Sequence, residues 1–151
     1  MPKLRHFAGL NQAEKALFLR ALVMLPVVDS ELRVRGWRRC HARLASWAKR
    51  RAKSATAAGI PPERVAWLVD RAARNVPWPA TCLRRSLVLW ALLERAGVAT
   101  DLRLGFRKTD GVFEAHAWVE LDGVPLNDRR DVRTRYQMAG QALAPGDWAE
   151  A

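Results

Sequence analysis

Apolar residues recur at helical spacing through the first half of the chain, and this pattern predicts three helices. The first runs from a capping-box spacing at Asn11 to Pro26. The second covers residues 30–52, with apolar residues on one side, arginines on the other, and Gly36 as a point where the helix kinks or divides. The third begins at two consecutive prolines and covers residues 61–74.

A dense apolar run over residues 87–93 predicts the central helix of the fold. Thr81 is its expected N-cap, and Gly97 follows its last periodic residue. Because apolar residues cover most of its circumference, this helix must be packed on several sides, and we expect it to form the core.

After Gly97 the apolar period changes to two. Strands are predicted over residues 101–107 and 112–121, joined by a hairpin turn over Thr109, Asp110 and Gly111. A further turn leads into a third strand over residues 124–128. These elements predict an α+β fold, in which a helical N-terminal half with a buried core helix packs on an antiparallel meander of at least three strands.

The C-terminal part is polar and then rich in alanine, glycine and proline. We predict a short helix over residues 133–141 and weak order in the last ten residues. The length suits a single domain over residues 1–151. Within it we distinguish a helical docking part, a catalytic core and a C-terminal tail, over residues 1–76, 77–131 and 132–151 respectively.

Basic residues outnumber acidic ones, 26 to 15, and the formal net charge is +11 at pH 7. Such a charge suits a nucleic acid, an anionic surface or an acidic peptide. It also fits the Ala/Arg bias of a GC-rich genome, so it discriminates weakly between these partners. No apolar run is long enough to span a bilayer, and no signal peptide is recognised. A cytoplasmic protein without disulfides is therefore expected.

Cys82 falls in the first turn of the predicted core helix. Unpaired N–H groups and the helix dipole favour a thiolate there, which lowers the cysteine pKa. A lone cysteine beside a leucine-rich helix is more often a packing residue than a nucleophile. His116 in a strand and Asp128 in the adjoining one favour the nucleophile, because thiol catalysis needs an imidazole to transfer the proton and a carboxylate to orient it.

The turn at Gly123 decides which carboxylate faces His116. With a three-residue loop, Asp128 falls opposite His116, and this is the register we predict. With a two-residue turn, Asp128 falls opposite Ala117, and Asp131 becomes a rival orienting residue.

Two tryptophans are candidates for contacts to the substrate or the oxyanion. Trp78 lies in a proline-containing approach to the core helix and either plugs the core or contacts substrate. Trp118, beside the candidate base, is the second. The backbone N–H of Cys82 is the expected first oxyanion donor, and the indole N–H of Trp78 is a candidate for the other.

No metal or other cofactor is expected, because His6, His41 and the two cysteines are scattered and no phosphate-binding glycine motif occurs. The second cysteine, Cys40, lies in a basic helical segment and is expected to be structural.

Three segments of the chain resemble the transglutaminase-like cysteine protease domain of lasso-peptide biosynthesis: TCLRRSLVLWALLERAG, LRLGFRK and EAHAWVELDGVPLND. The resemblance covers residues 78–131 and implies a transglutaminase- or papain-like core. It implies that Cys82 is the nucleophile, His116 the general base and Asp128 the third member of a triad. The implied activity is a cysteine peptidase that removes the leader peptide of a ribosomally made precursor.

The same resemblance implies partners. Some family members carry a leader-recognition module ahead of the peptidase, but the helical pattern before Cys82 does not resemble it. We therefore expect a separate leader-recognition protein and a downstream ATP-using lasso cyclase, with the helical part as the docking surface. Neither a membrane nor a nucleic acid is an expected partner.

Two other functions stay open at this point. A basic binding module for nucleic acid or acidic peptides would use Cys82 and His116 only as core residues, and its binding would be salt-sensitive. An acyl transferase would use the same triad, with an amine in place of water.

Overall fold

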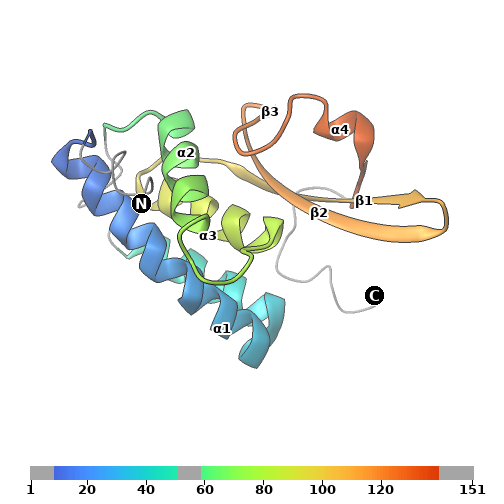
Figure 1. The fold of residues 1–151 in the computed structure, drawn as a ribbon, viewed down its shortest axis with the longest axis horizontal. Helices are drawn as coiled ribbons and strands as arrows, with labels where there is room; N and C mark the ends of the chain where they lie inside the picture. Colours follow the sequence, from blue (N-terminus) through green and yellow to red (C-terminus); the bar gives the residue numbers. More distant parts are fainter. Residues whose placement is uncertain (1–8, 51–58, 140–151) are drawn as a thin grey trace.

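A computed structural model describes residues 9–50 and 59–139 of the chain. These residues form an α+β fold, in which α1, α2 and α3 gather on one side and a long β-hairpin, with α4 beside it, projects to the other (Figure 1). The elements in chain order are α1 (Gln12–Lys49), α2 (Pro62–Ala73), α3 (Cys82–Arg95), β1 (Asp101–Thr109), β2 (Val112–Leu121), β3 (Val124–Pro125), α4 (Val132–Arg135) and β4 (Gln137–Met138). None of the helices in the described ranges is long and apolar enough to cross a bilayer.

α1 begins as predicted and breaks at Gly36, where a kink or division was expected, but the predicted end at Pro26 is absent. The capping box at Asn11 is formed, with its side chain accepting from the N–H of Glu14 at 2.9 Å. The helix then continues through Pro26 and breaks at Gly36, whose φ of 76° is accessible mainly to glycine. The second limb of α1 folds back beside the first (Figure 1). The predicted end at Pro26 is therefore wrong.

Burial explains why Pro26 does not end the helix. A proline removes one helical hydrogen bond. Leu25 and Val28, on either side of that position, are each 1% exposed and belong to the main core. Packing of this face therefore outweighs the lost bond, and the helix ends only where Gly36 changes the backbone direction.

α3 is the central helix, as predicted. Thr81 caps its start by accepting from the N–H of Arg84, and Gly97, with φ of 80°, lies just past its end. There the N–H of Val98 donates to the carbonyl of Leu93 at 2.9 Å. The helix contacts α1, α2, β1 and β2. Its fully buried side chains include Leu87, Val88, Leu89 and Ala91.

The four strands form an antiparallel sheet in the order β3-β2-β1-β4. Between β2 and β3, Leu121 pairs directly with Val124 across a two-residue turn. Both turn residues, Asp122 and Gly123, have positive φ, as in the type I′ turn that suits strand twist. The predicted three-residue loop is therefore wrong, and β3 ends at Pro125 instead of residue 128.

The segment after β3 also differs from the prediction. The expected helix over residues 133–141 is only the short α4, because Tyr136 is extended and leads into β4 on the edge of β1. Val132 and Tyr136 pack on Trp118 in a second small core. Residues 132–139 are thus attached to the sheet through Val132 and Tyr136, whereas the rest of the predicted tail lies outside the described residues.

Candidate active site

The first turn of α3 brings Cys82 against the middle of β2. Cys82 and His116 line the same two pockets, and the groups that act on the pKa of the Cys82 thiol are the His116 ring and the backbone of Ala117 and Leu83. Cys82 is half-buried, and it lines a 560 Å³ cleft together with His116 and Asp128. The structure therefore brings the predicted nucleophile and base together.

The pKa values of the Cys82 thiol and the His116 imidazole both differ from the ordinary values of these groups. Burial by itself raises the pKa of the Cys82 thiol, but the bonds to His116 and Ala117 outweigh it and hold the pKa below 9.0. The bond to Cys82 is also the main reason why the pKa of His116 lies above 6.5, against the effect of burial. Together these shifts favour a thiolate paired with an imidazolium, the reactive form of a catalytic cysteine.

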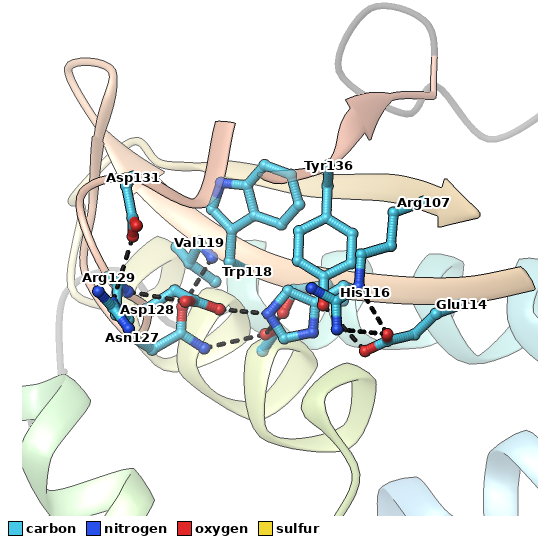
Figure 2. Close-up of polar contacts among 12 residues, drawn as sticks. Arg107, Glu114, His116, Trp118, Val119, Asn127, Asp128, Arg129, Asp131 and Tyr136 are labelled. Carbon is cyan, nitrogen blue, oxygen red and sulfur yellow. Dashed lines mark hydrogen bonds and ion pairs between the residues drawn. The ribbon is translucent and has the colours of Figure 1, made fainter. Parts of the chain in front are cut away.

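Asp128 orients the imidazole. Its Oδ2 accepts a hydrogen bond from Nε2 of His116, and its Oδ1 accepts from the N–H of Arg129 at 2.7 Å (Figure 2). Because Asp128 occupies Nε2, Nδ1 is the ring nitrogen left for Cys82. The rival Asp131 instead pairs with the Arg129 side chain at 3.3 Å. Asp128 thus reaches the base from the loop after β3, although the predicted strand register is wrong.

Two residues to which the sequence analysis gave no role hold this loop in place. The side-chain carbonyl of Asn127 accepts from the N–H of Val119 at 2.8 Å, and its amide donates to Ser86 Oγ at 2.9 Å. Ser86, fully buried, donates to the carbonyl of Ala117 at 3.0 Å. The available signal was spacing, because Ser86 lies four residues after Cys82 and so on the same face of the helix.

The transglutaminase-like superfamily matches residues 21–140, a span that includes Cys82, His116 and Asp128. The chain belongs to this superfamily. Its members are typically cysteine peptidases or transglutaminases. No curated protein and no solved structure was found to match the chain.

One tryptophan candidate of this transglutaminase-like protein is wrong. Trp118 is fully buried, and its indole N–H donates to Glu120 at 2.8 Å, so it is not available to an oxyanion. The segment that contains α4 and β4 covers this face of the sheet. Trp78 is half-buried, and its indole N–H has no hydrogen-bond partner within the described part of the chain. Its role stays a prediction.

Cys40 has the opposite environment from Cys82. It is 1% exposed, and burial followed by the nearby charge of Glu31 raises the pKa of its thiol to about 11. A thiol of this kind is protonated at neutral pH and does not act as a nucleophile. In the transglutaminase-like fold Cys40 is therefore a packing residue, as the sequence indicated.

Proposed function

We propose that the protein is a cysteine peptidase that removes the leader peptide from a ribosomally made lasso-peptide precursor. The observation that carries the peptidase activity is that Cys82, His116 and Asp128 line one cleft, with His116 hydrogen-bonded to Asp128, the pKa of the thiol lowered and that of the base raised. The choice of substrate rests on the resemblance of residues 78–131 to leader peptidases of this class.

The proposed reaction is acyl transfer to water in two steps. The Cys82 thiolate attacks the scissile carbonyl carbon, and the tetrahedral intermediate collapses to a thioester as His116 gives its Nδ1 proton to the departing amine. Water then loses a proton to His116 and attacks the thioester, which releases the acid and the thiol. Asp128 accepts from Nε2 of His116 and keeps the imidazole in the orientation that both transfers require.

The start of α3 supplies the expected oxyanion donor. The backbone of Ala117 and Leu83 helps to lower the pKa of the Cys82 thiol, and the N–H of Arg84 donates to the Thr81 cap. The N–H of Cys82 itself, one of the orphan donors of the first turn, is the group that we assign to the developing oxyanion.

We further propose that a separate leader-recognition protein docks on α1, and that the cleaved peptide passes to a lasso cyclase. Leu19, Val23 and Val27 follow one another at one-turn intervals and are 51%, 65% and 53% exposed. They border a 630 Å³ groove that also contains Arg20 and Arg43. Such a surface suits an apolar partner segment that carries acidic residues.

The test is cleavage of lasso-peptide precursors, each incubated with its own leader-recognition protein and followed by mass spectrometry. We expect the wild type and Cys40→Ala to cleave the precursor into leader and core peptide. Cys82→Ala and His116→Ala should leave the precursor intact. Val23→Asp should lose cleavage of the precursor but keep the reaction of Cys82 with iodoacetamide. Cleavage that survives Cys82→Ala would refute the proposed nucleophile.

The same assay distinguishes hydrolysis from a second candidate activity, acyl transfer to an amine. This candidate is supported by the transglutaminases that belong to the superfamily. With an added primary amine, a peptidase yields the free carboxylic acid. A product whose mass includes the amine would instead assign the chain to acyl transfer.

A further inference from the structure

We infer that an apolar pocket beside Cys82 selects substrates with an apolar side chain next to the bond that is cleaved. The inference rests on the proposed function, because it uses Cys82 as the reacting group. The pocket has a volume of 260 Å³ and opens at Cys82 and His116. Its other lining residues are all apolar: Trp37, Leu83, Leu104, Phe106, Ala115 and Ala117.

The register of the hairpin creates the hollow. Leu104 pairs with Ala117, and Phe106 pairs with Ala115, so each large residue of β1 faces a methyl group on β2. Such pairs leave space above the alanines that a larger cross-strand partner would fill.

Trp37 and Leu83 close the sides of the pocket. Trp37 follows the break in α1 at Gly36, and Leu83 follows Cys82 in the first turn of α3. The pocket is thus built from α1, α3 and both long strands, which makes it a feature of the assembled fold.

The second pocket at Cys82 has a different chemistry. The 560 Å³ cleft between α2 and the loop after β3 contains charged residues, among them Asp70, which pairs with Arg74 at 2.8 Å and with Arg85 at 3.0 Å. Both pockets share Cys82 and His116. A peptide bound across the sulfur therefore meets an apolar surface on one side and a charged one on the other.

The size and lining of the apolar pocket indicate which kind of substrate side chain it can hold. It is smaller than the pockets that hold whole drug-sized ligands, so it suits a single side chain. An aliphatic or aromatic side chain gains from leaving water there. A charged side chain would lose its hydration and find no partner among the lining residues apart from the catalytic pair.

Peptidyl chloromethyl ketones test the inference, because the thiolate displaces chloride and the product is seen by intact mass. We would vary the two residues before the reactive group one at a time, through norleucine, phenylalanine, aspartate and lysine. At one of these positions, norleucine or phenylalanine should label Cys82 at least about ten times as fast as aspartate or lysine does. A difference of this size is the effect of burying one apolar side chain. Iodoacetamide measures the intrinsic reactivity of the thiol.

A filled pocket should lose this preference. Ala115→Leu places a larger side chain in the hollow, and Ala115 is exposed, so the fold has room for it. Val112→Leu is the matched control, because it also enlarges a residue of β2, and Val112 is 68% exposed and does not line the pocket. In Ala115→Leu, the ratio of the labelling rate with norleucine or phenylalanine to that with aspartate or lysine should fall toward one. The rate of reaction with iodoacetamide should stay as in the wild type.

The failures of the two proposals are distinguishable. If Cys82 reacts with every chloromethyl ketone at the same rate, the pocket has no selective role, and the proposed peptidase is unaffected. If Ala115→Leu keeps the full preference, the selectivity comes from elsewhere and the inference is equally overturned. If Cys82 reacts with none of the reagents, including iodoacetamide, the proposed nucleophile is wrong and the inference falls with it.

Discussion

Cys82 and Cys40 differ in what surrounds each sulfur. Around Cys40, burial and Glu31 raise the pKa to about 11, whereas His116 and backbone N–H groups lower that of Cys82 below 9.0. A reagent that needs a thiolate should therefore modify Cys82 first at neutral pH. Cys40 serves as an internal reference in any labelling experiment.

His116→Ala should raise the apparent pKa of Cys82. The substitution removes the hydrogen bond and charge that favour the thiolate and leaves the burial that opposes it. The thiolate fraction at pH 7 then falls, and alkylation by iodoacetamide should slow by up to about tenfold for each unit of upward shift. The measurement is the alkylation rate against pH, with Cys40→Ala as the control. Superimposable profiles for wild type and His116→Ala would contradict the assigned pair.

At the scale of elements, the face of β1 and β2 away from α3 is tightly packed around Gly105. Gly105 lies opposite His116, and a Cβ at Gly105 would come within 2.8 Å of the Tyr136 Cβ and 3.0 Å of the Trp118 ring. The Tyr136 ring also stacks on the His116 ring, with 4.8 Å between their centres. Tyr136, which lies between α4 and β4, and the base therefore share one layer of side chains.

Gly105→Ala should destabilise the fold through this layer. Overpacking of this kind costs about 1–3 kcal/mol, because Tyr136 and Trp118 have to move. Urea unfolding measures the free energy of unfolding, and Gly9→Ala is the control, since no atom lies within 4 Å of a Cβ at Gly9. Equal midpoints for the two variants would mean that the layer adapts without cost.

For the molecule as a whole, Glu120 joins the C-terminal segment to the sheet. It is fully buried, and its carboxylate accepts from Arg133 of α4, from Arg103 of β1 at 3.1 Å and from Trp118 at 2.8 Å. Burial raises the pKa of this carboxyl, but the Arg133 and Trp118 bonds outweigh it, so the pKa lies below 4.5. Glu120 is therefore charged in the folded protein at neutral pH.

Glu120→Gln should lower the free energy of unfolding at pH 7 by about 3 kcal/mol. This value is at the lower end of the cost of removing one partner of a buried ion pair, because the partner Arg133 is 46% exposed. A lowered carboxyl pKa stabilises the fold above pH 4.5, and this contribution is lost as the pH falls through the folded-state value. The difference from wild type should therefore shrink on acidification. Urea unfolding at several pH values checks this, with exposed Glu63→Gln expected within about 0.5 kcal/mol of wild type. A difference independent of pH would exclude the charge as its cause.

The sequence by itself determined the features that depend on near neighbours. The Asn11 capping box, the Thr81 cap and the period-two strands need only residues a few positions apart, so local chemistry predicts them. The same holds for Cys82, since any residue just after the cap lies among the free N–H groups of the first turn.

Only the tertiary structure decided the features that depend on distant partners. The α1 helix passes through Pro26 because both neighbouring residues are buried, and Trp118 is covered by a segment that follows it in the chain. Asp128 meets His116 from a loop that Asn127 and Ser86 hold, not through strand register. These three features depend on contacts between residues far apart in the sequence, and local propensity does not determine such contacts.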